Sequence, residues 1–382
     1  MKVVFANHEP FDPGRARALA MLRLVAAVAR LNPVTLLSPD SPERLQEVFR
    51  GELGLEWPQG LTARQLPAVY KLFGLTLNAI FLRALRRALV EVAPDILWLR
   101  SDKLAAHFAR RGGPRLVFEA HTVAALYRQE RGASARQVQR LRAMERAIYG
   151  AATGVAALNA LVLEDVRREF GYRGPAAEIP GGVDPALFKP LWQGGDGRTV
   201  VYAGTMQFWK GLDTLMEAMA LAPGLRLKLV GSGKPEEEAE LRRAAQAPGL
   251  ASRVEFTGRV AQRELPPLLA ACACAVHPLP AELSIGERHT SPLKVFEYMS
   301  LGMPIVASDV PSLRECLADG ANARLYAAGD AAALAASLTQ VCADREFAGR
   351  VSARARADST RYTFDARALT LLDLFERVLS AR

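Results

Sequence analysis

The chain has 382 residues, half of them hydrophobic, and a mean hydropathy of +0.05, which is typical of a globular protein. This length exceeds what a single hydrophobic core usually organises, so we expect two domains. No apolar run is long enough to cross a bilayer, and the N-terminus enters a strand without a signal-peptide pattern. Cys272 and Cys274 alternate on a predicted buried strand, which fits reduced thiols. We therefore expect a cytoplasmic protein.

The positive charge is concentrated in the first half of the chain. Residues 1–190 contain 27 Lys and Arg against 18 Asp and Glu, so by difference from totals of 49 and 40 the remainder contains 22 of each. This asymmetry favours an anionic partner for the first domain, such as a phosphorylated acceptor or an anionic membrane surface. Nucleic acid is not expected, because no recognition helix or aromatic-interleaved basic strand accompanies the charge.

The first predicted elements form a strand–helix–strand unit. Residues 2–7 predict a buried strand, residues 15–30 a helix and residues 34–39 a second strand. This spacing is typical of parallel strands, whose ligands bind beyond their carboxyl ends. In the loop between them, Gly14 allows a close backbone approach and Arg15 can hold an anion, which predicts an acceptor-side site. A surface turn with solvated arginines explains the loop equally well, because no GxGxxG fingerprint is present.

Residues 66–92 predict a basic amphipathic helix. Its charges before the final turn are all positive: Lys71, Arg83, Arg86 and Arg87. Such a helix could lie on an anionic membrane, and the protein would then act on a lipid-linked acceptor at the inner face of that membrane. Packing against the sheet with a basic outer face is the favoured interpretation, because apolar helical stripes usually belong to a core.

Two further strands are predicted at residues 95–100 and 115–122. The second ends in His121, at the carboxyl end of a strand, where a ligand is expected. A hydrogen-bonded loop histidine is the alternative. Residues 127–150 then predict one long basic helix, and Asn159 separates the next strand from its helix.

Domain boundaries are predicted from the Pro- and Gly-rich stretch EIPGGVDPALFKP at residues 178–190. We expect an N-terminal domain over residues 1–183 and a C-terminal domain over residues 184–360. Residues 361–382 predict a final helix.

The second half begins with another strand–loop–helix unit. Gly204 leaves the strand, and Lys210 lies before the helix in an otherwise apolar loop, where it can reach a phosphate oxygen. The next strand ends at Gly231, where the backbone can approach a nucleotide, although a bare GxG is weak evidence. A further strand ends at Gly258 and Arg259.

Residues 283–309 (LSIGERHTSPLKVFEYMSLGMPIVASD) contain a loop, a helix and a buried strand. Ser291 is expected to cap the helix, with Pro292 at its first position. The helix start offers unpaired N–H groups to an anion. Lys294 in the first turn is unfavourable unless something negative docks, and Glu297 lies three residues further on. An ordinary amphipathic helix with both charges solvated is the alternative.

The segment SPLKVFEYMSLGMPIVAS resembles the donor-site motif of retaining glycosyltransferases of the GT-B fold, family 4 or group 1 type. The resemblance implies an α/β protein with two Rossmann-like parallel-sheet domains facing across a cleft. The first domain would bind the acceptor, the second a nucleotide sugar, and the final helix would pack back on the first.

The resemblance also implies residue roles. His121, Lys210 and Glu297 would be catalytic: His121 beside the transferred sugar, Lys210 on the diphosphate and Glu297 on the ribose hydroxyls. Donor binding would involve further residues along the second domain: Gly204, Thr205, Gly231, Gly258, Arg259, Ser291, Pro292, Leu293 and Lys294. Two positions depart from the family pattern, because Thr205 replaces the usual arginine and His289 replaces the first of two glutamates.

The resemblance therefore implies a retaining hexosyltransferase that uses a UDP- or GDP-sugar and a glycan, lipid-linked or other hydroxyl acceptor, in cell-envelope polysaccharide synthesis. No cofactor and no metal are expected, since the sequence has no Asp-x-Asp motif or His/Cys ligand cluster. A nucleotide-sugar epimerase of the same fold and a non-catalytic homologue acting as a binding partner are the alternatives. A dehydrogenase is disfavoured by the missing dinucleotide fingerprint.

Overall fold

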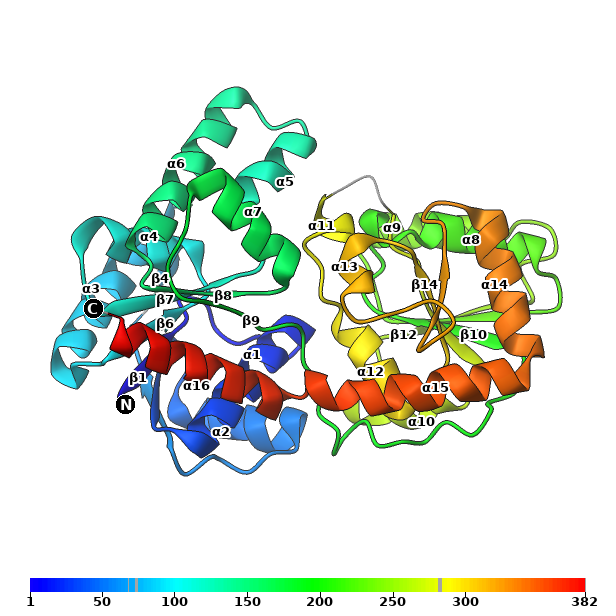
Figure 1. Ribbon diagram of the computed structural model, residues 1–382, viewed down its shortest axis with the longest axis horizontal. Helices are drawn as coiled ribbons and strands as arrows, with labels where there is room; N and C mark the ends of the chain where they lie inside the picture. The colour runs from blue at the N-terminus through cyan, green and yellow to red at the C-terminus, as the bar shows by residue number, and fades with distance from the viewer. Residues whose placement is uncertain (68, 73–74, 281–283, 382) are drawn as a thin grey trace. The chain divides into compact units, whose positions relative to one another are not determined.

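The computed structural model describes residues 1–381 except 68, 73–74 and 281–283, and it describes no side chains at 69–72, 75–78 and 208. The chain forms two compact units (Figure 1). Unit 1 comprises Met1–Pro180 and Phe364–Arg382, and unit 2 comprises Gly181–Thr363. Each unit is an α/β structure around one parallel sheet, which confirms the predicted fold class.

Unit 1 contains seven parallel strands in the order β3-β2-β1-β6-β7-β8-β9. Their bounds are β1 (Val3–Ala6), β2 (Val34–Ser38), β3 (Leu61–Gln65), β6 (Ile96–Leu99), β7 (Arg115–Ala120), β8 (Gly154–Ala157) and β9 (Ala176–Glu178). The inner strands β1, β6 and β8 are buried along their whole length, which explains their unbroken apolar sequences.

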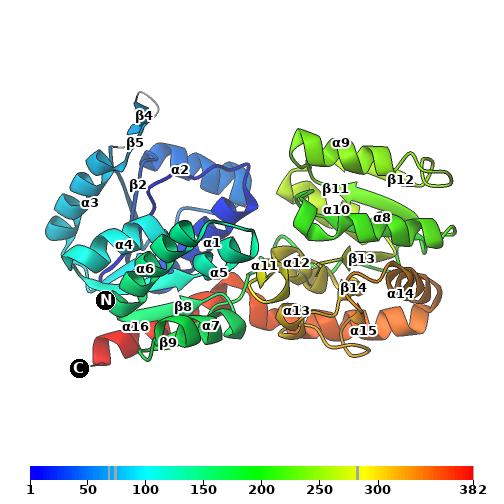
Figure 2. The same cartoon turned by 90° about the horizontal axis from the view of Figure 1, so that it is seen from above.

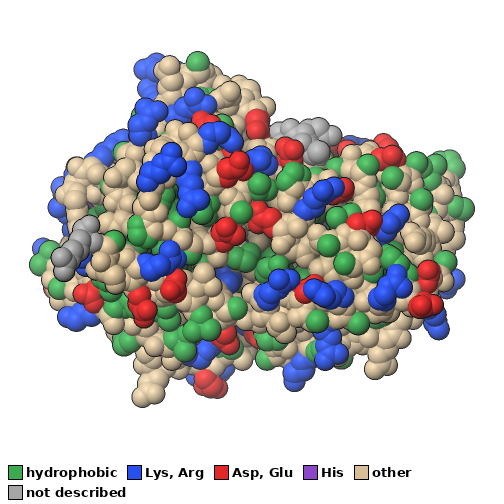
Figure 3. Space-filling view, in the orientation of Figure 1, with side chains coloured by type: hydrophobic (Ala, Val, Ile, Leu, Met, Phe, Trp, Pro, Cys, Tyr) green, Lys and Arg blue, Asp and Glu red, His purple; other side chains and the backbone are tan. Residues whose placement is uncertain are grey.

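The helices of unit 1 cover both faces of its sheet (Figures 1 and 2). They are α1 (Ala16–Leu31), α2 (Pro42–Val48), η1 (Phe49–Leu53), α3 (Asn78–Val92), α4 (Asp102–Arg111), α5 (Ala124–Glu130), α6 (Ala135–Ala151), α7 (Ala160–Phe170) and α16 (Phe364–Ser380). Helices α1 and α16 pack together on one face, and α3, α4, α6 and α7 bury their apolar residues on the other. Figure 3 shows Lys and Arg side chains gathered over the region of α5 and α6.

Unit 2 contains six parallel strands in the order β12-β11-β10-β13-β14-β15. They are β10 (Thr199–Ala203), β11 (Arg226–Val230), β12 (Val254–Gly258), β13 (Cys274–His277), β14 (Ile305–Ser308) and β15 (Arg324–Tyr326). The helices are η2 (Phe208–Lys210), α8 (Leu212–Leu221), α9 (Pro235–Ala244), η3 (Gln262–Glu264), α10 (Leu265–Ala270), α11 (Ser284–Glu287), α12 (Leu293–Leu301), α13 (Pro311–Arg314), α14 (Ala331–Ala343), α15 (Arg345–Ser359) and η4 (Thr360–Tyr362). One core lies under α10 and α12, and a second under α8 and α14.

The prediction of one helix over residues 66–92 is wrong. Two short antiparallel strands, β4 (Val69–Leu72) and β5 (Leu75–Leu77), precede α3. Val69, Tyr70 and Thr76 favour extended backbone, which explains the strands. Within α3, Phe81 and Leu85 are buried in the core, whereas the three arginines at 83, 86 and 87 are exposed. The favoured interpretation of a packed helix with a basic outer face therefore holds for α3, and Lys71 lies outside the described side chains.

The long helix predicted at residues 127–150 is two helices, α5 and α6. Gly132, with φ +71°, ends the first in a conformation that suits glycine. Ser134 begins the second with a capping box, in which its hydroxyl accepts from Gln137 N and its own N–H donates to the Gln137 side chain. The sequence GASARQ therefore contains a helix stop and a start that the basic pattern concealed.

Candidate functional site

The carboxyl ends of three adjacent strands in unit 2 bring together three of the predicted donor-site glycines. Gly204 follows β10 and its N–H donates to Val230 O, while the N–H of Gly231 donates to Gly258 O. Gly231 has φ +136°, and a Cβ there would overlap the carbonyl oxygen of Gly204. Packing between neighbouring strand ends therefore requires glycine at Gly231, whether or not a nucleotide approaches.

Lys210 lies at the same edge of the sheet, at the end of η2. Its Nζ lies 3.6 Å from the centroid of the Trp209 ring, and burial lowers the pKa of Lys210 to about 7. No acidic side chain in the described part of unit 2 forms an ion pair with it. A lysine in this state gains its charge most easily when an anion is bound.

His277 is a candidate that the sequence reasoning missed. It is the last residue of β13, next to β10, and only 3% of its surface is exposed. Burial, and then the charge of Lys210, lower the pKa of His277 to about 3. Neither ring nitrogen has a hydrogen-bond partner among the described residues. The available signal was its position at the carboxyl end of a buried strand, in CACAVHPLP.

Lys294 and Glu297 form an ion pair on α12, with 2.5 Å between Nζ and Oε2. Glu297 is 4% exposed, so this carboxylate is buried against its neighbours. The expectation that only a docked ligand would balance Lys294 is therefore wrong, because Glu297 supplies a negative charge one turn along the helix.

The helix begins differently from the prediction. Its N-cap is Pro292, without a side-chain cap, and its first residue is Leu293. The hydroxyl of Ser291 instead accepts the N–H of Gly181 at 2.7 Å. Leu283, the first residue of the predicted stretch, lies outside the described residues, and α11 occupies part of the predicted loop.

Tyr298 connects α12 to the strand that carries Gly204. Its hydroxyl accepts the N–H of Ala203, the last residue of β10, at 2.9 Å. This bond places the Lys294–Glu297 helix beside the loop of Thr205, whose carbonyl accepts the hydroxyl of Tyr202 at 2.8 Å.

The two positions that depart from the family pattern have local roles. Thr205 is exposed, and its hydroxyl donates to the Gln207 side chain. His289 is 3% exposed, and its N–H donates to Ser284 O. Arg259 is exposed just after β12.

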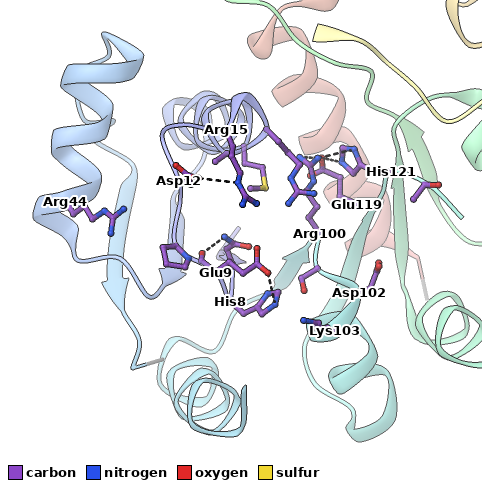
Figure 4. A pocket seen from close by; sticks show the side chains of 17 residues that line it. His8, Glu9, Asp12, Arg15, Arg44, Arg100, Asp102, Lys103, Glu119 and His121 are labelled. Carbon is purple, nitrogen blue, oxygen red and sulfur yellow. Dashed lines mark hydrogen bonds and ion pairs between the residues drawn. The ribbon is translucent and has the colours of Figure 1, made fainter. Parts of the chain in front are cut away.

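Unit 1 has a hollow of about 700 Å³ at the carboxyl edge of its sheet (Figure 4). It is bordered by the loops after β1, β6 and β7 and by the start of α1. The residues around it are Asn7, His8, Glu9, Pro10, Asp12, Arg15, Arg17, Ala18, Met21, Arg44, Arg100, Ser101, Asp102, Lys103, Glu119, His121 and Thr122. The structure thus brings together His121 and Arg15. Gly14 lies in the adjoining loop, where its N–H donates to Asp12 Oδ1.

Glu119 holds His121 in place. His121 Nε2 donates to Glu119 Oε1 at 2.7 Å, and Arg100 donates to His121 Nδ1 at 3.3 Å. Since an arginine can only donate, Nδ1 is the acceptor and Nε2 carries the hydrogen. Trp98 Nε1 donates to the other Glu119 oxygen, and Arg367 of α16 lies 3.7 Å from Oε1.

These contacts set the protonation states of the pair. Burial alone would raise the pKa of Glu119, but the His121 hydrogen bond and the charges of His121, Arg100 and Arg367 lower it to about 2. Burial, and then Arg100, lower the pKa of His121 to about 4. The imidazole is therefore neutral near pH 7, with both nitrogens engaged.

Comparison with known proteins identifies the chain. Residues 18–187 match the family model "Glycosyltransferase Family 4", and residues 197–344 match "Glycosyl transferases group 1". Together these matches extend over most of both units. The chain belongs to the group 1, family 4 glycosyltransferases. The first segment lies almost entirely in unit 1 and the second in unit 2, so the family assignment rests on both halves of the chain.

Curated members of this family align with about half of the chain. The phosphatidyl-myo-inositol mannosyltransferase of Mycolicibacterium smegmatis is 34% identical over 217 residues, which cover 54% of this chain and 53% of the relative. The D-inositol 3-phosphate glycosyltransferase of Xylanimonas cellulosilytica is 30% identical over 260 residues, covering 62% and 61%. The chain thus spans between half and two thirds of the length of these glycosyltransferases.

Solved structures of other proteins share the fold over nearly the whole chain. A sucrose-phosphate synthase from Thermosynechococcus elongatus has a TM-score of 0.79 at 21% identity, covering 100% of both chains. The Anabaena protein HepE in complex with UDP-glucose has a TM-score of 0.71 at 18% identity, covering 98% of this chain and 99% of its own. At these identities the likeness establishes the two-sheet GT-B architecture.

The described residues contain neither a helix that could cross a membrane nor a cluster of metal ligands. No helix there combines the length and hydrophobicity needed to span a membrane. In the same part of the chain, no group of three or more His, Cys, Asp and Glu side chains is placed to hold a metal ion.

Proposed function

We propose that the protein is a retaining glycosyltransferase that moves a hexose-type sugar from a nucleotide diphosphate sugar to a hydroxyl acceptor, without a metal. Membership of the family supports a glycosyltransferase. The structural neighbour HepE is known in complex with UDP and with UDP-glucose, which supports a nucleotide sugar as donor. A UDP- or GDP-sugar fits this proposal. We assign the donor to unit 2 and the acceptor to unit 1.

The observation that carries this proposal is the state of Lys210. A half-buried lysine whose pKa is lowered to about 7, with no acidic partner among the described residues, is costly to charge in the ligand-free protein. A diphosphate at the carboxyl ends of β10 and β11 would supply the missing counter-charge, at the edge where ligands of parallel sheets bind.

The neighbouring residues would complete the donor site. Glu297 would accept hydrogen bonds from the ribose hydroxyls, and Lys294 would turn from Glu297 toward the phosphates when the donor binds. The N–H groups of Ser291 and Leu293, on either side of Pro292, and the backbone of Gly204 would line the diphosphate. Those of Gly231 and Gly258, with Arg259, would border the base.

The reaction that follows involves one bond exchange at the sugar. The bond between the anomeric carbon and the β-phosphate oxygen breaks, and the acceptor hydroxyl oxygen bonds to that carbon from the same face. The departing phosphate takes the hydroxyl proton, so no side-chain base is required. Lys210 and Lys294 would stabilise the negative charge on the phosphate. His121, kept neutral by burial and by the charge of Arg100, would contact the transferred sugar through its backbone or ring edge.

The activities named for the relatives support a proposal about the biological role of this activity. They include mannosyl and glycosyl transfer to inositol-containing acceptors and a lipopolysaccharide core glycosyltransferase of Rhizobium meliloti. We propose a role in cell-envelope glycan synthesis for the present protein, in the cytoplasm or bound peripherally at the inner face of the membrane. The exposed arginines of α3 would provide the membrane contact.

A calorimetric titration tests the donor site. The purified protein is titrated, in the presence of EDTA, with UDP, GDP, ADP and dTDP. We expect one of these to bind, and we expect Lys210→Met and Glu297→Ala each to weaken binding by tenfold or more. Lys189→Met and Glu217→Ala, which replace exposed residues of unit 2, are the matched controls.

The outcomes separate the alternatives. Absence of binding at millimolar concentrations would overturn the enzyme proposal and favour a non-catalytic homologue, which the departures at Thr205 and His289 would then explain. Incubation with donor alone, followed by product analysis, would reveal an epimerase. Retention is established by the anomeric configuration of the transferred sugar in NMR spectra of the product.

A further inference from the structure

We propose that Cys342 is a thiol that reacts with peroxides and that Cys274 resolves its oxidised form as a reversible disulfide within unit 2. The two cysteines come from different elements: Cys274 is the first residue of β13, and Cys342 lies in the last turn of α14. This modification site lies at the opposite end of β13 from His277 and is independent of the proposed transfer reaction.

The two sulfur atoms are already in contact. Their separation is 3.8 Å, although 68 positions lie between the residues in the sequence. A disulfide bond is about 2.05 Å long, so the sulfurs have to approach by about 2 Å for the bond to form. Cys342 is the next-to-last residue of α14, so this movement falls on a helix end, where the backbone yields more easily than in the middle of an element.

Cys342 is the partner that an oxidant can reach. It is half-buried and borders a pocket of about 230 Å³, which Trp192, Gly197 and Arg345 also line. A peroxide is little larger than a water molecule, whose share of liquid volume is about 30 Å³, so the pocket can admit it. Cys274 has no exposed surface and is not among the residues that line the pocket. Oxidation therefore begins at Cys342.

The loop over residues 192–197 forms one wall of the pocket and is held against the chain just before β13. Trp192 Nε1 donates to Cys272 O at 3.0 Å, and the N–H of Asp196 donates to Ala271 O at 3.1 Å. A Cβ at Gly195 would overlap the same Cys272 carbonyl, so loop and strand entry are in close contact. This packing keeps the backbone of Cys272 covered, and Cys342 is the cysteine that faces the pocket.

The contact between the sulfurs also favours the thiolate at Cys342. The S–H of Cys274 donates to the Cys342 sulfur and lowers the pKa of Cys342, although burial acts in the opposite direction. The same hydrogen bond, together with burial, raises the pKa of Cys274. Because the thiolate is the nucleophile that attacks a peroxide, Cys342 reacts first and has a protonated thiol beside it.

The reaction takes two steps. The Cys342 thiolate attacks the hydroxyl oxygen of a hydroperoxide, the O–O bond breaks, and Cys342 becomes a sulfenic acid. The other oxygen leaves as water or an alcohol after taking up the proton that the thiol had released. The Cys274 sulfur then attacks the Cys342 sulfur, so that the S–S bond forms, the S–O bond breaks, and the hydroxyl leaves as water with the Cys274 proton. The two thiols are oxidised and the peroxide is reduced, and a dithiol reductant reverses the change.

The other two cysteines serve as internal controls. Cys272 and Cys316 are both buried, and burial raises the pKa of each thiol to about 12. Neither has a thiolate population at neutral pH, so neither should react in the folded protein. The structure thus predicts different outcomes for four thiols in one chain.

Peptide mapping of the full chain tests the proposal. The reduced protein, freed of reductant, is treated with a small molar excess of hydrogen peroxide, and the remaining thiols are then blocked with N-ethylmaleimide in denaturant. After trypsin digestion without reduction, we expect a disulfide between peptides 264–288 and 325–345, which dithiothreitol removes, while Cys316 carries the maleimide. Oxidation without this linked pair would overturn the proposal, as would an equal yield of the pair from protein unfolded in urea before peroxide is added.

Variants assign the link, because Cys272 and Cys274 lie in the same tryptic peptide. Cys272→Ser and Cys316→Ser should keep the disulfide. Cys274→Ala should lose it and should convert Cys342 to the sulfinic acid, since no thiol is left to resolve the sulfenic acid. A link retained in Cys274→Ala would assign the bond to Cys272 and overturn the proposal. Circular dichroism verifies that each variant is folded, and fragmentation of the linked peptide from the unaltered protein gives the same assignment without any variant.

The melting temperature reports whether the folded backbone accepts the bond. A disulfide between β13 and α14 closes a long loop in the unfolded chain, so the oxidised protein should melt at the same or a higher temperature than the reduced protein. A marked fall would show that the bond forms only when this part of unit 2 unfolds, and the proposal would fail. Covalent dimers on a non-reducing gel, in place of the internal link, would overturn it as well.

Discussion

Lys294 and Glu297 are paired at 2.5 Å on α12, although each has been assigned to a different part of the nucleotide sugar. In the ligand-free protein the lysine neutralises the buried carboxylate. Donor binding would replace this pair with two separate contacts to the ligand. Because the ion pair must first be broken, each contact adds less binding free energy than it would from an unpaired side chain.

Loss of Lys294 should destabilise the ligand-free protein, because it leaves the buried carboxylate of Glu297 without its partner. We expect Lys294→Met to lower the free energy of unfolding by about 1–3 kcal/mol, measured by urea denaturation near pH 7. The double variant Lys294→Met, Glu297→Gln should recover much of that loss. An unchanged midpoint in Lys294→Met, matching the exposed control Lys189→Met, would show that the pair contributes nothing.

Nucleotide affinity should depend on pH through Lys210. Its pKa is lowered to about 7 in the ligand-free protein, and a bound diphosphate favours the protonated amine. We therefore expect affinity for the diphosphate to fall as the pH rises from 7 to 9, with proton uptake on binding. Calorimetry in buffers of different ionisation enthalpy measures that uptake. Lys210→Met retains the titration of the ligand itself and should lose the additional proton.

The same shift has a consequence for stability. The unfolded chain keeps Lys210 protonated up to its usual pKa of about 10.4, while the folded protein releases that proton from about pH 7. The unfolded state thus binds more protons in this window, so the contribution of Lys210 makes the protein more stable as the pH rises from 7 to 10. Between pH 7 and pH 10, the melting temperature should rise more steeply with pH in the unaltered protein than in Lys210→Met. Parallel curves would contradict the assigned pKa.

Glu119 should be essential to the folding of unit 1. Its removal leaves Arg100 and Arg367 buried without a counter-charge, so Glu119→Gln is expected to cost about 3–5 kcal/mol of stability. Because the pKa of Glu119 is lowered to about 2, its contribution is present above pH 4.5 and is lost as the pH falls toward 2. Urea titrations at pH 7 and pH 3 should show a smaller difference between unaltered and variant proteins at pH 3. The exposed Glu47→Gln is the control.

Alanine at Gly231 should disturb the end of β11. Its Cβ would overlap the carbonyl oxygen of Gly204, and the φ of +136° is unfavourable for alanine. A loss of about 1–3 kcal/mol in stability is expected. Gly224→Ala, where a Cβ meets nothing within 4 Å, is the matched control. Equal melting temperatures for the two variants would mean that the strand ends can separate at no cost.

Local patterns in the sequence were sufficient for several inner strands, whereas β4 and β5 were mistaken for helix. The apolar runs of β1, β6, β10 and β14 are short, buried and bounded by turn residues, so their positions and parallel arrangement followed directly. The same reasoning placed Gly204, Gly231 and Gly258 at strand ends. These features depend on residues close together in the chain.

Contacts between residues that are far apart in the sequence could not be predicted from local patterns. Ser291 has the sequence of a helix cap, yet its hydroxyl accepts the N–H of Gly181, 110 residues earlier. Glu119 looks like one polar residue within an apolar strand, and its partners Trp98 and Arg367 come from other elements. Nothing in the local sequence around His277 indicates that it is buried and close enough to Lys210 to feel its charge. In each case a tertiary contact, absent from any local pattern, determined the role.

The position of α16 determines the order in which the molecule can be completed during synthesis. This helix packs on α1, β8 and β9, so unit 1 is assembled from two stretches separated by the whole of unit 2. The ribosome synthesises every residue of unit 2 before it synthesises α16. Unit 2 can thus reach its final structure while the sheet face that carries α1 still lacks α16, and the apolar residues left uncovered there must remain soluble throughout the interval.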